Sequence, residues 1–191
     1  MARTKEFEPE VALRRAVDVF WERGYEKTSM EDLVQRMGIG RRSLYDTFGD
    51  KHALFLQALR TYTAQQDAQT AEIAEKAANA RQAIRWLLET SLADGSVLRR
   101  GCLAVNTSTE AATSDPEASA VLERHFAHGR QLVQGLVERG RRDGTITADH
   151  DTATLTATVF NAWLGLRVRV RAGASLDQLA ADINAMLALL H

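Results

Sequence analysis

The 191-residue sequence is poor in several features on which other protein classes depend: it has one cysteine, two prolines and 6% aromatic residues. Cys102 alone cannot form an intrachain disulfide, so we expect a reducing compartment and a cytoplasmic protein. No run of 18 apolar residues occurs, and the opening segment MARTKEFEPE has no apolar signal-peptide core, so no membrane partner is expected. The net charge of −1 excludes a chain that coats nucleic acid through overall positive charge, and any anion would bind at a local patch.

Alanine, leucine, arginine and glutamate dominate what remains, and the apolar residues recur at helical spacing. This pattern predicts an all-α fold of about nine helices. Pro9 is placed to begin the first helix and Gly24 to end it. Two short helices are expected within residues 29–48, and loops at 94–101 and 113–117. Later helices are expected over residues 51–78, 80–93, 103–112, 117–143, 150–172 and 176–190.

The two short helices have clear boundaries. Thr28 is the expected N-cap of the first, and Glu31, three residues later, would complete a capping box. Gly38 is suited to end that helix in the left-handed conformation, and Gly40 opens the next. A three-residue Gly-Ile-Gly turn therefore joins the pair, which is the layout of a helix-turn-helix. The apolar face of its first helix comprises Met30, Leu33, Val34 and Met37.

Positive charges stand at the starts of two of these predicted helices: Arg41 and Arg42 follow Gly40, and Lys51 follows Asp50. Helix N-termini carry about +0.5 of partial charge and favour acidic residues by roughly 0.3–1 kcal/mol per charge. A polyanion that docks on both helix starts would make these cations favourable, because free N–H groups there bind phosphate. A solvated basic corner is the alternative. The capping box, the turn and the spacing to Lys51 favour DNA.

The segment GYEKTSMEDLVQRMGIGRRSLYDTFGDKHALFLQAL resembles the DNA-binding signature of the TetR/AcrR family of bacterial transcriptional regulators. The residues that carry the resemblance are Gly24, Tyr25, Thr28, Leu44, Tyr45, Phe48 and Lys51. The resemblance implies a three-helix DNA-binding domain over residues 1–50. It also implies a larger helical domain over residues 51–191 that dimerises and binds a small-molecule effector.

By position, the resemblance implies that Thr28 and Tyr45 contact phosphates, that Lys51 anchors the backbone and that residues 41–43 approach bases. Asp46 and Thr47 depart from the commonest family pattern, which indicates an unusual operator, since an acid can accept a hydrogen bond from cytosine N4. Arg3 and Lys5 form either an arm toward the DNA or a disordered tail. The candidate DNA-binding residues are Thr28, Ser29, Arg41, Arg42, Ser43, Tyr45, Thr47 and Lys51.

The last two predicted helices suit dimerisation. The family pairs them with their symmetry mates in a four-helix bundle, and small residues such as Gly165 allow close packing. An ordinary internal core seam is the alternative explanation. The candidate dimer residues are Leu155, Val159, Leu166, Leu176, Leu179, Ile183 and Leu187.

An effector pocket is expected in the larger domain, where three glycines (residues 129, 135 and 140) interrupt a strong helical pattern and indicate close helix crossings or space beside a cavity. Aromatic residues would line it and polar residues would orient the ligand, although aromatics at helical spacing also form ordinary cores. The candidate ligand-binding residues are Trp86, Cys102, Asn106, Glu110, Phe126, Phe160 and Trp163.

No cofactor and no metal are predicted. His125 and His128 are three residues apart on one helix, but without further ligands a solvated pair is favoured over a metal site. Cys102 follows Arg99 and Arg100, which could lower a thiol pKa and make it a redox or electrophile sensor, whereas a buried inert cysteine is the alternative.

These patterns predict a non-enzymatic, homodimeric repressor that a small molecule releases from a palindromic double-stranded operator. A TetR-like regulator switched by modification of Cys102 is the alternative, as is one that activates or works without ligand. An enzyme is disfavoured by the lack of a Gly-x-Ser-x-Gly elbow, a phosphate-binding glycine loop and a His-Glu-x-x-His motif. A structural nucleoid protein is disfavoured by the slight charge and the large second domain.

Overall fold

The computed structural model describes residues 7–92, 100–110 and 114–191; Arg3, Lys5, Arg99 and most of the predicted loop at 94–101 lie outside these ranges. Within them the chain forms α-helices and one 3-10 turn and no β-strand, which confirms the all-α prediction. No described helix combines the length and apolarity needed to cross a membrane. The helices are α1 (Pro9–Arg23), α2 (Met30–Met37), α3 (Arg41–Phe48), α4 (Lys51–Lys76), α5 (Ala80–Glu89), α6 (Leu103–Glu110), α7 (Pro116–Asp143), α8 (Thr152–Arg171) and α9 (Leu176–Ala188), with the 3-10 turn at Thr90–Leu92.

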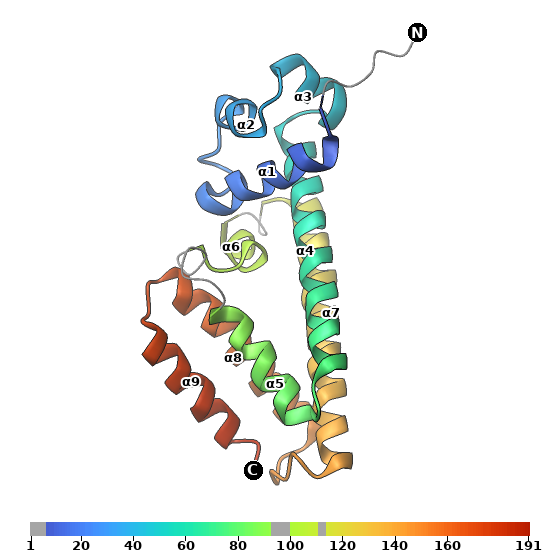
Figure 1. Cartoon of the computed structure of the whole chain (residues 1–191), viewed down its shortest axis with the longest axis vertical. Helices are drawn as coiled ribbons and strands as arrows, with labels where there is room; N and C mark the ends of the chain where they lie inside the picture. The colour runs from blue at the N-terminus through green and yellow to red at the C-terminus, as the bar shows by residue number, and fades with distance from the viewer. Residues whose placement is uncertain (1–6, 93–99, 111–113) are drawn as a thin grey trace.

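Helices α1 to α3 form a small head at one end of an elongated molecule (Figure 1). The long helices α4 and α7 run side by side from the head to the opposite end, while α5, α8 and α9 pack beside them in the body. The short helix α6 lies where the head meets the body. The DNA-binding motif predicted from sequence is therefore presented at one tip of the molecule.

Side-chain caps begin most of these helices, and one predicted cap is wrong. The N-cap of α2 is Ser29, whose hydroxyl accepts from the backbone N–H of Asp32 at 3.1 Å, while the Asp32 carboxylate accepts from the Ser29 N–H at 3.0 Å. The segment offers two overlapping capping boxes, and the structure uses this one instead of Thr28 with Glu31. The Ser29 hydrogen bonds, the backbone one foremost, lower the pKa of Asp32.

The core of the head depends on the packing of α1 against α4. Phe20 and Phe55 are fully buried and meet edge to face, with ring centroids 5.1 Å apart. Leu33, Leu44 and Phe48 add the inward faces of α2 and α3 to the same cluster. The cluster continues past residue 50 into α4, α6 and the start of α7, so the predicted boundary between residues 50 and 51 crosses a continuous core.

A second core fills the body between α5, the far half of α7, α8 and α9. Phe126 on α7 and Leu164 on α8 are partly buried and pack against both cores. A shift of α7 or α8 would therefore also displace residues of the core that supports the head.

The structure corrects the predicted dimer residues, because most of them pack inside the protomer. Six of the seven are at most 4% exposed and belong to the core of the body: Leu155, Val159, Leu166, Leu179, Ile183 and Leu187. Leu176, at the start of α9, is 51% exposed. The apolar seam is the internal core seam that the sequence left open as an alternative, and a partner would have to use the opposite faces of α8 and α9.

The three glycines of α7 lie in different surroundings. A Cβ added at Gly129 would lie 3.2 Å from Trp163 and 3.3 Å from Phe160, so this glycine lets α8 approach closely. At Gly140 the added atom would lie 2.5 Å from Ile146, whereas at Gly135 it would meet nothing within 4 Å. Because the atom added at Gly140 would also lie 3.1 Å from Ala80 of α5, the predicted close crossings are present at two of the three positions.

Gly140→Ala should lower the free energy of unfolding by about 1–3 kcal/mol, because the added methyl overlaps the buried Ile146 side chain. Gly135→Ala is the matched control in the same helix and should raise it by up to about 1 kcal/mol, because alanine has the higher helix propensity. Urea unfolding followed by circular dichroism at one protein concentration measures both. Shifts of the same sign in the two variants would contradict the close packing at Gly140.

Candidate nucleic-acid interface and ligand cavity

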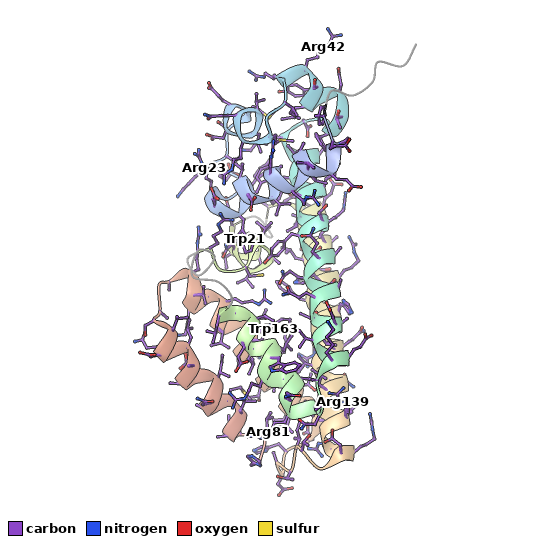
Figure 2. The ribbon with its side chains drawn as sticks, in the orientation of Figure 1. Trp21, Arg23, Arg42, Arg81, Arg139 and Trp163 are labelled. Atoms are coloured by element: carbon purple, nitrogen blue, oxygen red, sulfur yellow. The ribbon has the colours of Figure 1, made fainter. Side chains whose placement is uncertain are left out.

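The start of α3 is an exposed, positively charged surface that is suited to an anion. Its N-cap, Gly40, supplies no side-chain hydrogen bond, and its first turn contains no acidic residue, so the helix leaves its first N–H groups free of side-chain caps. Arg41 and Arg42 stand on that turn with exposed side chains, and Arg42 points away from the head at its outer end (Figure 2). Free amide donors and two cations therefore face solvent together.

Contacts from α1 and α4 hold α3 at a fixed angle. Gly38 ends α2 with a φ of 71°, in the left-handed region that glycine adopts without strain. Arg15 donates to the last carbonyl of α2, at Met37, over 3.0 Å, and Gln57 on α4 donates to the carbonyl of Phe48 over 3.1 Å. The C-terminal ends of α2 and α3 are thus tied to the two helices that form the core of the head.

Lys51 begins α4, the helix that follows α3. Asp50 caps this helix by accepting from the Ala53 N–H at 2.8 Å. The Lys51 ammonium lies 4.3 Å from the centroid of the Tyr25 ring, which packs against Phe55. Burial, followed by the nearby charge of Glu26, raises the pKa of Tyr25, so its ring stays neutral beneath the lysine. The cation is therefore positioned by an aromatic face rather than by a carboxylate.

The remaining predicted DNA contacts on α3 lie on its outer surface. Tyr45 is 44% exposed, unusual for a large aromatic residue, and Ser43 and Thr47 are half-buried. Asp46 lies 3.7 Å from the Arg42 guanidinium, a weak exposed pair that leaves the arginine free to reorient. The structure thus places the candidate residues 41–47 along α3, and Lys51 begins the next helix.

Thr28 is placed differently from the prediction. Its side chain is 1% exposed, and its hydroxyl donates to the carbonyl of Gly24 over 2.6 Å. A buried hydroxyl with this partner fixes the turn between α1 and α2 and is not available to a phosphate. Ser29 beside it is exposed at the N-terminus of α2 and keeps its candidate role.

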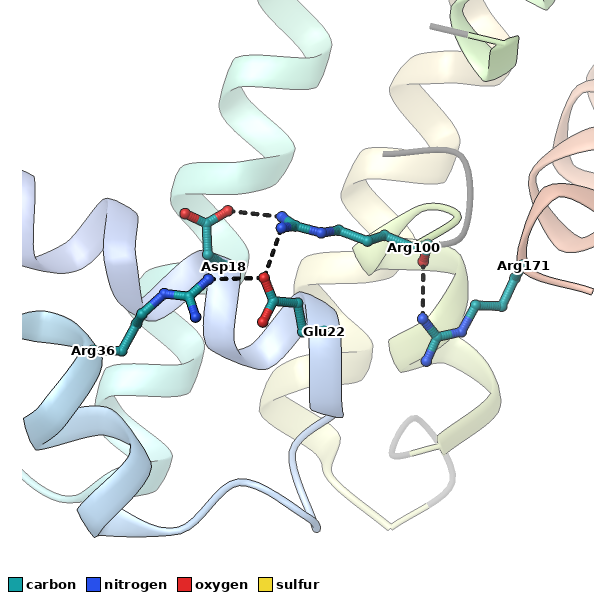
Figure 3. A network of polar contacts seen from close by, with 5 residues as sticks. All are labelled: Asp18, Glu22, Arg36, Arg100 and Arg171. Carbon is teal, nitrogen blue, oxygen red and sulfur yellow. Dashed lines mark hydrogen bonds and ion pairs between the residues drawn. The ribbon is translucent and has the colours of Figure 1, made fainter. Parts of the chain in front are cut away.

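Arg100, which comes just before α6, connects the head to the body. Its guanidinium donates to Asp18 over 3.0 Å and to Glu22 over 2.6 Å, both on α1 (Figure 3). Glu22 also accepts from Arg36 of α2, and the Arg100 carbonyl accepts from Arg171 at the end of α8. From the sequence, the only role expected of Arg100 was to lower the pKa of Cys102. Its pairing with Glu22 could not be predicted, because the two residues are 78 positions apart and no local pattern connects them.

The structure places six of the seven predicted ligand residues in two separate spaces and Trp86 in neither. Asn106 and Glu110 border a cleft of about 360 Å³ between the end of α1 and α6, where Glu110 accepts from the backbone N–H of Glu26 at 3.0 Å. Trp86 is half-buried on α5 against the core of the body. The second space, which we call the inner cavity, lies between α6, α7 and α8 and is lined by Cys102, Phe126, Phe160 and Trp163 together with Val105, His125, Gly129, Leu164 and Arg167.

Cys102 and the two histidines also have defined partners. Cys102 is 2% exposed, and its sulfur accepts a hydrogen bond from the Tyr62 hydroxyl at 3.4 Å. Burial raises the pKa of Tyr62 well above its ordinary value. His125 Nδ1 lies 2.7 Å from Asp67, and His128 lies 3.3 Å from the same carboxylate. The pair is thus not simply solvated, and burial lowers the pKa of His125. No group of three metal-ligating side chains occurs in the described ranges.

A helix-turn-helix with exposed cations at two helix starts, carried on a larger helical body, defines a DNA-binding protein of the helix-turn-helix class. Residues 12–58 match the family model of bacterial regulatory proteins of the tetR family, and residues 84–186 match the tetracyclin repressor-like C-terminal domain. The chain belongs to the TetR family of transcriptional regulators. It is accordingly a DNA-binding regulator, as the sequence predicted.

Relatives extend over the whole chain. The HTH-type transcriptional regulator YezE of Bacillus subtilis is 31% identical over 196 residues, covering 100% of both chains, and the HTH-type transcriptional repressor ComR of Escherichia coli is 30% identical over 182 residues, covering 93% of this chain and 86% of ComR. A cysteine mutant of the TetR family regulator CifR, solved with 26-base-pair operator DNA, superimposes with a TM-score of 0.85 at 32% identity, covering 100% of both chains.

Arg42→Ala should weaken operator binding by about tenfold or more and reduce the dependence of affinity on salt, because the arginine is exposed at the start of α3, the predicted reading helix, without a strong partner. Fluorescence anisotropy at several salt concentrations, on an operator selected from random duplex DNA, measures both. Arg130→Ala, which removes an exposed arginine from α7, is the matched control. Equal affinity of the wild type and Arg42→Ala would contradict the assignment of α3 as the reading helix.

Proposed function

We propose that the chain is a homodimeric repressor that a small-molecule ligand releases from a palindromic operator. The observation that carries this proposal is the position of Arg100, whose side chain pairs with α1 of the head while its carbonyl contacts Arg171 of α8. A movement of the body helices is thereby transmitted to the head through charge-assisted hydrogen bonds.

A dimer fits the exposed faces of α8 and α9. Asn161, Gly165 and Val168 follow one another at helical spacing on the outward side of α8, and Val168 is 50% exposed. Leu176, which begins α9, and Leu189, the residue that follows this helix, are 51% and 57% exposed. Exposed apolar side chains next to small residues are typical of helices that pack against a second copy.

Two heads must be spaced correctly to read one operator. Adjacent half-sites on one face of DNA lie about 34–36 Å apart, or a multiple of that distance. Helix α4 has 26 residues and spans about 39 Å at a rise of about 1.5 Å per residue, so a small tilt at its body end moves the head by several ångströms. A ligand that prefers the tilted dimer lowers operator affinity by its differential affinity for the two states.

A reporter assay distinguishes repression from activation by this chain. With the selected operator placed between a promoter and a reporter gene, the wild-type chain should lower expression, and Arg42→Ala should restore it. Increased expression with the wild type would support an activator instead. ComR is named as a repressor, and the same sign of regulation is proposed here.

Gly165→Glu should convert the dimer to a monomer without unfolding it. A Cβ added at residue 165 would meet nothing within 4 Å in the protomer, whereas in a closely packed dimer a glutamate there would bury an unpaired charge. Sedimentation velocity at micromolar concentration measures the change, and circular dichroism checks the fold. Gly135→Glu, at the equally open glycine of α7, should leave the dimer intact. If both variants dimerise as the wild type does, the interface lies elsewhere.

A further inference from the structure

Arg167 of α8 is a buried cation without a counter-charge. Its side chain lines the inner cavity, the residue is 7% exposed, and its Nε is buried without an acceptor among the described residues. No described carboxylate lies within ion-pair distance of its guanidinium, which packs 4.6 Å from the centroid of the Trp163 ring. Buried charges in folded proteins are nearly always paired, so this arrangement lacks a partner.

The unsatisfied groups at this site are all donors. The indole Nε1 of Trp163 is also buried without a partner in the described part of the chain. Arginine and tryptophan side chains can donate hydrogen bonds but cannot accept them. A ligand that satisfies both must offer acceptors, and one that also balances the guanidinium must carry negative charge.

The rest of the cavity surface is apolar and aromatic. Phe126, Phe160 and Leu164 surround the space that Arg167 borders. His125 also borders it, but burial lowers the pKa of this histidine, so it adds no second cation at neutral pH. The free volume is about 10 Å³, which is about the room that one water needs, so a larger ligand enters only when α7 and α8 separate or the aromatic rings turn.

We propose that the inner cavity is the effector site and that it takes a small organic monoanion, an aromatic carboxylate, whose carboxylate pairs with Arg167 and whose ring lies among Phe126, Phe160 and Trp163. The inference deepens the proposed function and rests on it for the regulatory consequence. Because Phe126 and Leu164 pack against both cores, a ligand that moves them displaces the support of the head.

The test uses the full-length protein and three aromatic carboxylates: benzoate, phenylacetate and 3-phenylpropionate. Each is paired with its neutral amide. Thermal unfolding and isothermal titration calorimetry should show that at least one carboxylate raises the Tm of the wild type and that its amide does not. Arg167→Met should weaken binding of that carboxylate at least about tenfold, since hydrogen bonds to charged groups are worth at least that factor. Arg130→Met, at an exposed arginine of α7, should bind like the wild type.

A second readout separates a ligand-binding arginine from a structural one. Without ligand, Arg167→Met should raise the Tm, because methionine fills similar space and removes an unpaired buried charge. A lower Tm, equal binding of acids and amides, or no response to any of the three acids would overturn the inference. Operator binding by the wild type with and without the bound carboxylate tests the regulatory role separately. Carboxylate binding that leaves operator affinity unchanged would retain the site and refute ligand release.

Discussion

The packing of α1 against α4 is the contact on which the other parts of this molecule depend. Phe20, Phe55 and Tyr25 form one aromatic cluster at the point where α4 leaves the head. The cluster sets the angle between the head and the long helix, and it also supports Lys51 through the ring of Tyr25. Lys51 and the long helix α4 thus depend on one cluster of packed rings.

Polar contacts then fix the orientation of the head more narrowly than the apolar packing does. Apolar packing is roughly proportional to buried area and is only weakly directional, whereas the two hydrogen bonds from Arg100 to Asp18 and Glu22 have fixed geometry. Glu110 adds a third connection by accepting from the backbone of Glu26, and its carboxylate lies against Gly24. Together these contacts make the orientation of the head depend on α6 and the end of α8, and the same helices border the inner cavity.

The arginines of the head and the cavity arginine of the body differ in their exposure to solvent. In the head, Arg41 and Arg42 are exposed, so water solvates them until an anion arrives. In the body, Arg167 is only 7% exposed, and its guanidinium packs against the Trp163 ring without a described carboxylate beside it. The first arrangement costs little in the unbound protein, while the second is unfavourable until a partner enters. Each arrangement is suited to a negatively charged partner.

Local signals in the sequence predicted much of the fold and the helix-turn-helix. Helical periodicity gave the nine helices, and Gly38, Gly40 and Asp50 marked helix ends where the structure has them. These features depend on residues within one or two turns of each other, so the sequence contains all the information they need. The pairing of Arg100 with Asp18 and Glu22 could not be predicted from local patterns, because it joins segments about 80 residues apart.

The sequence by itself determined the class of fold, the helix-turn-helix and the cations at the starts of α3 and α4. Only the tertiary structure decided which polar and apolar faces lose contact with water. It buried the hydroxyl of Thr28, turned Leu179 and Ile183 into the protomer core, and enclosed Arg167. An amphipathic pattern shows that a face is covered but not whether the same chain, a second copy or a ligand covers it. That choice depends on which helices meet in space, and hence on the whole fold.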